Sequence, residues 1–290
     1  MKKKLKKILI AFKQLIKGKP VLRPMVVGLK RVERGVPVIL TQLNGIDIKF
    51  VCESPREESR IEQYSRLSKE PETYEWIDRF VKPGDVFYDL GSNTGGYSLY
   101  VGKKYQNMKI FGFDPDVQNI CQFNKNIMLN NLATCVSAFC ICIADCDSMA
   151  EMFMISDEGL FSAGHSGNMV NKNTNRDGEQ KVMAKIGSLQ LTIDTLIERF
   201  SFPCPNHIKI DVDGDEGKVI AGALKTLDRQ EVKTILVELD YSNTRLIDII
   251  LGMGFVGFTH FENELYYEME KIEHIPAAMW NKLFVRASMA

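Results

Sequence analysis

The 290-residue sequence predicts a doubly wound α/β fold with a mostly parallel sheet and an antiparallel terminal strand. Three observations predict it. From Asp85 onward, short apolar strands alternate with helical segments, which is the pattern of a parallel sheet with right-handed crossovers. A glycine-rich loop follows the first of these strands. The last two predicted strands, 255–261 and 283–287, lack an intervening helix of useful length, so we expect them to form an antiparallel edge.

The other elements of the predicted sheet follow in chain order. Strands are expected over 86–90, 108–113, 134–143, 207–212 and 234–239. Helices are expected over 97–104, 116–131, 189–200, 216–227 and 244–253. The polar, glycine-containing stretch 156–187 is expected to be a long loop, and loops of that length are usually functional.

The sheet domain is predicted to span residues 83–290 and to follow an N-terminal extension, residues 1–82. Within the extension, residues 36–52 predict a β-hairpin, because Asn44-Gly45 lies between two segments of alternating apolar residues. Residues 56–82 have helical periodicity and are expected to form a helical lead-in that stops at Pro83-Gly84.

The charge of the chain is asymmetric. Residues 1–32 hold eleven Lys or Arg and no Asp or Glu, which leaves 26 basic and 37 acidic residues in the remainder. The basic end suggests an anionic partner, phospholipid or nucleic acid, while the acidic body argues against a nucleic-acid groove. Residues 1–19 form an amphipathic pattern with two interpretations: a helix on an anionic membrane surface, or a helix packed on the body with solvated lysines.

The expected location is the cytoplasm, with peripheral contact at the inner membrane face under the first interpretation. No segment approaches the roughly 20 apolar residues of a membrane span. The seven Cys do not form a disulfide framework, because their number is odd and their spacing irregular.

The glycine-rich loop over 89–96 reads Asp-Leu-Gly-Ser-Asn-Thr-Gly-Gly. Gly91 and Gly95 would let the backbone approach a ligand, but their spacing differs from the dinucleotide motif Gly-x-Gly-x-x-Gly. Asp89 ends its strand where a carboxylate could meet the amino group of a methionine-like ligand. Asp114, 25 residues later, could accept both hydroxyls of a ribose. We therefore predict S-adenosylmethionine as the cofactor. The predicted cofactor-binding residues are Asp89, Gly91, Ser92, Asn93, Gly95, Asp114 and Asp145.

A second group of acidic residues follows the later strands. Asp211 ends the fourth strand, beside the expected methyl group, and is a candidate base or metal ligand. Glu238 ends the neighbouring strand, so its carboxylate could converge on Asp211 and hold Mg²⁺ with it. Lys209 alternates with apolar neighbours in its strand and is expected to point toward these acids. His165, in the long predicted loop, is an alternative base.

These motifs, in this order, resemble the FkbM family of S-adenosylmethionine-dependent methyltransferases. The resemblance runs from about Glu70 to about Tyr241 and is carried by Asp85–Gly96, Phe113-Asp114-Pro115, the helix Asn124–Asn131, Leu191–Leu196, Ile208–Glu216 and Val237–Leu239. It implies the seven-stranded class I methyltransferase sheet and O-methylation of natural products or glycans. The family often has Glu where this chain has Asp114 and Asp213, and a small or apolar residue where it has Asp215.

We therefore expect methyl transfer to a hydroxyl, on a sugar of a surface polysaccharide or its lipid-linked precursor, with substrate choice set by the first 70 residues and by 156–187. Two alternatives remain. Asp211-Val212-Asp213 also matches the Asp-x-Asp motif of metal-dependent glycosyltransferases, and the chain could be a non-catalytic S-adenosylmethionine-binding or membrane-adaptor protein. Asp215 and Glu216 are better explained as acidic residues that favour a helix start.

Overall fold

The computed structural model describes residues 29–33, 35–65, 70–155, 164–166, 182–212, 214–239, 244–261, 264–268 and 281–289. The predicted basic helix over 1–19 lies outside these ranges, as does most of the predicted loop over 156–187. Within the described ranges, no helix combines the length and the apolar character needed to cross a membrane.

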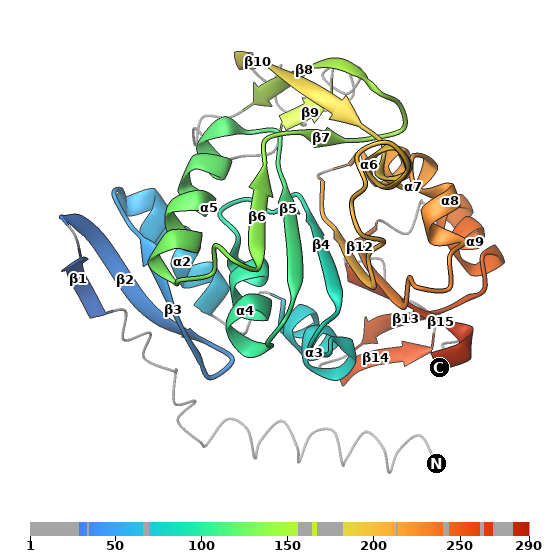
Figure 1. Cartoon of the computed structure of the whole chain (residues 1–290), viewed down its shortest axis with the longest axis horizontal. Helices are drawn as coiled ribbons and strands as arrows, with labels where there is room; N and C mark the ends of the chain where they lie inside the picture. The colour runs from blue at the N-terminus through green and yellow to red at the C-terminus, as the bar shows by residue number, and fades with distance from the viewer. Residues whose placement is uncertain are drawn as a thin grey trace, which may run out of the picture.

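A single eight-stranded sheet forms the centre of the molecule (Figure 1). In spatial order its strands are β14 (Glu264–Glu268), β13 (Phe255–Phe261), β15 (Asn281–Arg286), β12 (Thr234–Glu238), β11 (His207–Ile210), β4 (Val86–Leu90), β5 (Lys109–Phe113) and β6 (Val136–Phe139). The strands from β12 to β6 are parallel, and β15 runs antiparallel between β12 and β13. The predicted doubly wound sheet with an antiparallel terminal strand is confirmed, and β14 adds an eighth strand at its edge.

Helices connect the parallel strands as predicted, with two corrections. They are α4 (Gly96–Lys104), α5 (Val117–Leu129), α6 (Ile193–Glu198), α7 (Glu216–Ala221), α8 (Leu224–Leu227) and α9 (Thr244–Gly252). The helix predicted over 216–227 is divided between α7 and α8. At the break, a Cβ on Gly222 would lie 2.0 Å from the carbonyl oxygen of Ala144, so the chain packs there without a side chain.

The second correction concerns a four-stranded sheet of order β7-β10-β8-β9. Its strands are β7 (Cys142–Ile143), β8 (Ser148–Ile155), β9 (Gly164–Ser166) and β10 (Val182–Leu191). The predicted strand over 134–143 is divided between β6 and β7, and β9 and β10 occupy parts of the predicted loop. The helix predicted over 189–200 starts only at Ile193, because pairing with β8 holds residues 182–191 extended.

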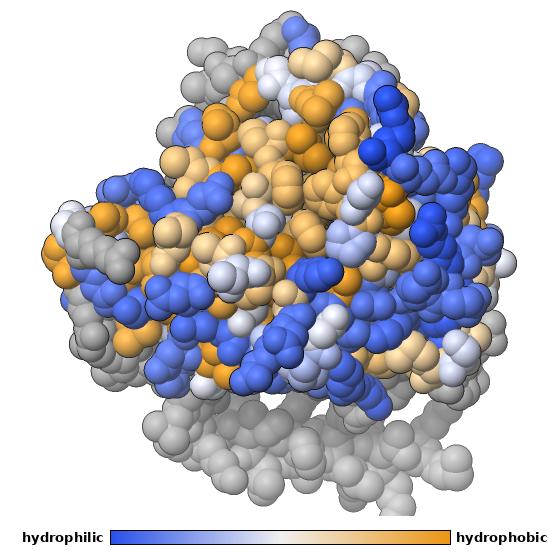
Figure 2. Space-filling view, in the orientation of Figure 1, coloured by the Kyte–Doolittle hydropathy of each residue, from blue (hydrophilic) through white to orange (hydrophobic). Residues whose placement is uncertain are grey.

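This second sheet lies over the carboxyl ends of the parallel strands, at the top of Figure 1. It begins directly after β6, so β7 carries the chain away from that edge. Figure 2, in the same orientation, shows apolar side chains gathered across the centre of the visible side, below the second sheet. The rings of Phe111, Phe139 and Phe202 pack against one another and against the core cluster that contains α6.

The N-terminal extension packs against the same core. The predicted hairpin is present as β2 (Val36–Leu43) and β3 (Ile46–Val51), and β1 (Leu29–Glu33) pairs with β2 as a third strand. The predicted helical lead-in is present as α2 (Pro55–Ser65) and α3 (Pro71–Phe80). Apolar side chains of the hairpin, α3 and α5 belong to one buried cluster.

Three amide side chains of α5 hydrogen-bond the free edge of β3. Gln122 Nε2 donates to the carbonyl of Val51 at 2.7 Å, and Asn126 Oδ1 accepts from the amide of Val51 at 2.9 Å. Asn130 accepts from the amide of Lys49 at 3.0 Å and donates to its carbonyl at 2.7 Å. Asn126 and Asn130 lie four residues apart on the helix, a rise of about 6 Å, and their partners Val51 and Lys49 lie two residues apart on the strand, a rise of about 6.8 Å. The two spacings match closely enough for successive helix amides to bond the strand edge.

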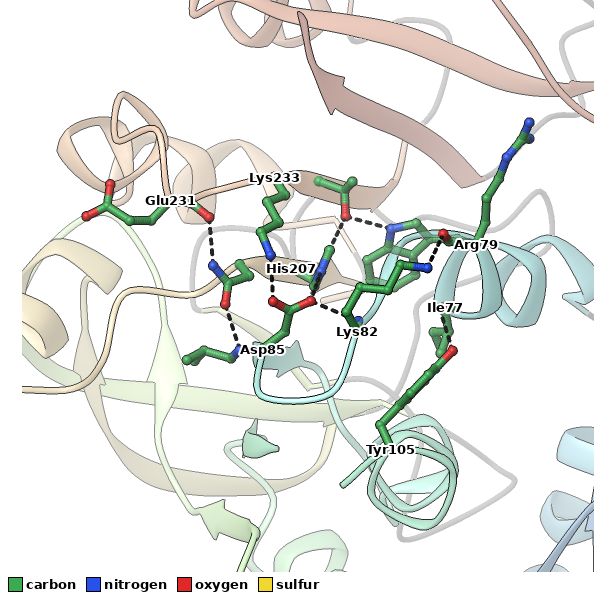
Figure 3. Close-up of polar contacts among 12 residues, drawn as sticks. Ile77, Arg79, Lys82, Asp85, Tyr105, His207, Glu231 and Lys233 are labelled. Atoms are coloured by element: carbon green, nitrogen blue, oxygen red, sulfur yellow. Dashed lines mark hydrogen bonds and ion pairs between the residues drawn. The ribbon is translucent and has the colours of Figure 1, made fainter. Parts of the chain in front are cut away.

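A buried polar network fixes the amino ends of β4, β11 and β12 (Figure 3). His207 Nε2 donates to the Asp85 carboxylate at 3.0 Å, and Lys233 also pairs with Asp85. His207 Nδ1 lies 2.7 Å from the Thr234 hydroxyl, which accepts from Trp76 Nε1 at 2.8 Å. Asp85, His207 and Thr234 are connected like a nucleophilic triad, but His207 and Thr234 are both 0% exposed, so the network is structural.

Protonation of His207 in mild acid should lower the free energy of unfolding. Burial lowers the pKa of His207 and outweighs the opposing effect of Asp85, so the unfolded chain binds the proton first. Between pH 7.5 and 5 we expect the unfolding free energy to fall as pH drops below about 6.5, by up to about 1.4 kcal/mol per pH unit. Urea unfolding of wild type and His207→Gln at several pH values measures this, and the same slope in both proteins would contradict it.

Candidate active site

The loop after β4 brings two glycines into close contact with neighbouring elements. Gly91 has a φ of +74°, and a Cβ there would lie 1.7 Å from the carbonyl oxygen of Asp211. Gly95 has a φ of +86°, and its Cβ would lie 2.0 Å from the ring of Phe123. Asn93 between them also has a positive φ, of 52°. The loop therefore adopts a conformation that other residues rarely take and lies directly against the end of β11.

Two side chains at this loop keep a buried polar atom without a hydrogen bond. Asp89 is 1% exposed, and its Oδ2 accepts from Ser98 Oγ at 2.6 Å, while its Oδ1 has no partner. The hydroxyl of Ser92 is likewise buried and unpaired. Burial raises the pKa of Asp89, although the Lys209 ammonium opposes the shift. Because each such atom costs roughly 1–3 kcal/mol when unpaired, these atoms fit a polar ligand with a donor group, such as the amino group of S-adenosylmethionine.

Asp114 lies at the end of β5 and joins that strand to the glycine loop. Its carboxylate accepts from the amides of Asn93 and Asp116 at 2.9 Å each, and from Asn119 Nδ2 at 3.2 Å. Burial raises the pKa of Asp114 to about 6, against the effect of these donors. The Oδ1 of Asn119 is buried and unpaired beside it. Sequence analysis missed Asn119, although it follows Asp114 by five residues at the start of α5.

Two predicted residues lie in the four-stranded sheet and its connections. Asp145 is exposed after β7, and its Cα lies 3.2 Å from a Cβ built on Gly222. In the described part of the chain, no hydrogen bond joins Asp145 to the glycine loop. His165 lies in β9, where its backbone pairs with Phe153 of β8, and its side chain lies outside the described residues.

The structure brings Lys209 and Asp211 together at the end of β11. Lys209 Nζ donates to Asp211 Oδ2 at 2.6 Å. Lys209 is 2% exposed, and burial alone would lower its pKa, but the charges of Asp211, Glu70 and Asp89 outweigh burial and raise it. The ammonium is therefore charged and held among carboxylates, while the side chain of Asp211 remains 30% exposed.

Glu238 ends β12 and shares a hydrogen bond with Asp211, so the two predicted carboxyl groups do converge. Burial, this hydrogen bond and the charge of Asp211 raise the pKa of Glu238 to about 8. A protonated Glu238 therefore donates to the Asp211 carboxylate near neutral pH. Among the described residues, no three His, Cys, Asp or Glu side chains are placed to hold a metal ion, and the cation beside Asp211 is Lys209. These residues do not fit the Mg²⁺ site that the sequence suggested.

Sequence analysis missed two further residues that lie near Lys209. Glu70, the N-cap of α3, accepts from the hydroxyl of Tyr97 at 2.6 Å. The ring of Tyr97, in the first turn of α4, has its centroid 5.1 Å from Lys209 Nζ. Tyr97 directly follows the glycine loop, which is the signal that could have identified it. Nothing in the sequence marks Glu70, because its contacts join distant segments.

The start of α7 behaves as the helix-start interpretation predicts. Glu216 accepts from the amides of Gly214 at 3.0 Å and Val212 at 3.4 Å. Asp215 occupies the N-cap position without a side-chain capping hydrogen bond and pairs with Lys218 at 3.0 Å. Asp213 lies outside the described residues.

Comparison with known families gives the class of protein that this fold and site define. Residues 89–267, more than half of the chain, match the methyltransferase FkbM domain. The chain belongs to the FkbM family of S-adenosylmethionine-dependent methyltransferases. The expected family is therefore confirmed.

Similar proteins cover most of the same region. The chain is 22% identical over 201 residues to hexuronic acid methyltransferase AglP of Haloferax volcanii, which covers 69% of this chain and 74% of AglP. It is 21% identical over 196 residues to 31-O-demethyl-FK506 methyltransferase FkbM of Streptomyces tacrolimicus, covering 62% and 74%. The crystal structure of methyltransferase FkbM from Methylobacillus flagellatus aligns with a TM-score of 0.44 at 14% identity, over 71% of this chain and 44% of that one.

Proposed function

We propose that the chain transfers a methyl group from S-adenosylmethionine to a hydroxyl oxygen of a sugar, glycan or natural product. The observation that carries the proposal is the half-buried Asp211 carboxylate at the end of β11, whose backbone contacts Gly91 of the cofactor loop. A carboxylate there can take the proton of an acceptor hydroxyl. Two relatives, a hexuronic acid methyltransferase and a 31-O-demethyl-FK506 methyltransferase, support an oxygen acceptor.

In this proposal the protein aligns the acceptor and removes its proton. Bound S-adenosylmethionine supplies the methyl group, and Asp89, Ser92 and the glycine backbone hold it. Asp211 orients the hydroxyl and accepts its proton. Lys209 and Glu238 both hydrogen-bond the Asp211 carboxylate and hold it in place. The basic residues 1–19 would bring the enzyme to a lipid-linked acceptor at a membrane surface.

The test is a transfer assay with methyl-labelled S-adenosylmethionine and a panel of acceptors. The panel holds hexosides, uronic acid glycosides, hydroxylated natural products and their matched deoxy compounds. We expect label in a hydroxyl-bearing acceptor and none in its deoxy counterpart. Binding of S-adenosylhomocysteine without transfer to any acceptor would favour the non-catalytic alternative, and transfer from a nucleotide sugar instead would favour the glycosyltransferase.

A further inference from the structure

The residues around the end of β11 carry more negative than positive charge. The charges of Asp211, Glu70 and Asp89 act on the ammonium of Lys209, and those of Asp211, Lys209 and Glu70 act on the carboxyl group of Glu238. Lys209 stands opposite Asp89 in the parallel pairing of β11 with β4. Its Nζ is already bonded to Asp211. The carboxylate cluster is defined as these four acids, Glu70, Asp89, Asp211 and Glu238, around Lys209, and its acids outnumber the Lys209 ammonium.

A second observation indicates that the cluster receives a ligand. The Oδ1 of Asp89 is buried and has no hydrogen-bond partner, although Oδ2 of the same carboxylate is paired with Ser98. The cluster also adjoins the cofactor loop, because the Asp211 carbonyl contacts Gly91. Both forms of the cofactor bring the same amino group to Asp89, so a difference between them has to come from the charge at sulfur. A positive charge near the loop would meet the carboxylates of the cluster in partly buried surroundings, where charges interact more strongly than in water.

The two forms of the cofactor differ in charge at sulfur. S-adenosylmethionine carries a positive sulfonium, and S-adenosylhomocysteine an uncharged thioether. We propose that the carboxylate cluster recognises the positive charge of the methyl donor, so that the enzyme binds S-adenosylmethionine more tightly than the product S-adenosylhomocysteine. This inference rests on the proposed function. The weaker binding of S-adenosylhomocysteine would favour release of the product.

The preference for the donor should also depend on pH. Glu238 faces Asp211 and Lys209 of β11 and Glu70 before α3, and its pKa is raised to about 8. A bound cation favours the ionised carboxylate, so donor binding near pH 7.5 should release protons that product binding retains. The preference for the donor should therefore increase as pH rises through about 8.

Calorimetric titration of the full chain with each cofactor, without acceptor, tests the proposal. We expect the donor to bind about tenfold more tightly at pH 8.5, and the ratio to fall severalfold at pH 6.5. Asp211→Asn and Glu238→Gln should each reduce the ratio severalfold at pH 8.5, with little change in product affinity. Matched controls are Asp248→Asn on α9 and Glu231→Gln before β12, both exposed, which should leave the ratio unchanged.

The outcomes separate this inference from the function on which it depends. Equal affinity for both cofactors, or a ratio that neither variant changes, would overturn the recognition of charge and leave the cofactor site intact. Failure of both cofactors to bind wild-type protein would overturn the proposed function itself. Titration in buffers of different ionisation enthalpy counts the released protons, and equal counts for donor and product would also contradict the proposal.

Discussion

Gly91→Ala should reduce affinity for S-adenosylhomocysteine at least about a hundredfold, because the cofactor loop cannot accommodate a side chain at this position. The added Cβ would lie 1.7 Å from the Asp211 carbonyl oxygen. That carbonyl cannot move freely, since the Asp211 amide donates to the carbonyl of Leu90 at 3.1 Å. Either the loop moves away from β11 or the two strands separate, and both changes disturb the cofactor contacts.

The matched control separates this contact from backbone strain. Gly84, just before β4, has a φ of +89° and open space around a built Cβ. Gly84→Ala should therefore cost only the left-handed strain, about 1–2 kcal/mol of unfolding free energy, and leave the affinity unchanged. Calorimetry and urea unfolding measure the two effects. Wild-type affinity in Gly91→Ala would exclude this loop as the cofactor site.

A companion variant keeps the prediction testable if Gly91→Ala does not fold. The Ser92 hydroxyl is buried and unpaired, so Ser92→Ala should leave the ligand-free protein as stable as wild type or more stable. The same variant should bind S-adenosylhomocysteine about tenfold more weakly if the hydroxyl bonds the cofactor. Lower stability with unchanged affinity would show that the hydroxyl serves the fold instead.

The sequence was most informative where one local rule determines the structure. Strand and helix alternation predicted the parallel sheet, and Asn44-Gly45 predicted the hairpin turn. The convergence of Asp211 and Glu238 was predictable because both end neighbouring parallel strands, with Ile210 opposite Val237. Residues at the carboxyl ends of such strands meet at one edge of the sheet.

Features that depend on pairing between distant segments were not predictable in this way. The strand β10 was interpreted as loop and helix, because its extended conformation comes from pairing with β8. The Mg²⁺ interpretation of the carboxylates is also not supported by the described residues. The sequence predicted that Lys209 points toward the acids. Only the structure shows that its ammonium is bonded to Asp211 and that Glu70, at the start of α3, joins the same group of acids.

Asp211→Asn should reduce kcat for methyl transfer by about 10²- to 10⁴-fold, the usual contribution of a general base. Affinity for S-adenosylhomocysteine should persist, since its uncharged sulfur does not need the Asp211 carboxylate. Retained binding also shows that the variant is folded, which matters because the buried ammonium of Lys209 loses its closest partner. A wild-type rate in Asp211→Asn would remove Asp211 from the role of base.

The pH profile should identify Glu238 as the group that tunes this base. Below about pH 8 Glu238 keeps its proton and donates a hydrogen bond to Asp211, which makes Asp211 a weaker base. Loss of that proton strengthens the base, so kcat/KM should rise with pH and level off above about 8. Glu238→Gln still donates a hydrogen bond but cannot ionise, and its profile should lose this rise, whereas the exposed control Glu231→Gln should retain it. A rise that survives in Glu238→Gln would assign the ionisation to another group, with Asp89 the first to examine, because burial raises its pKa as well.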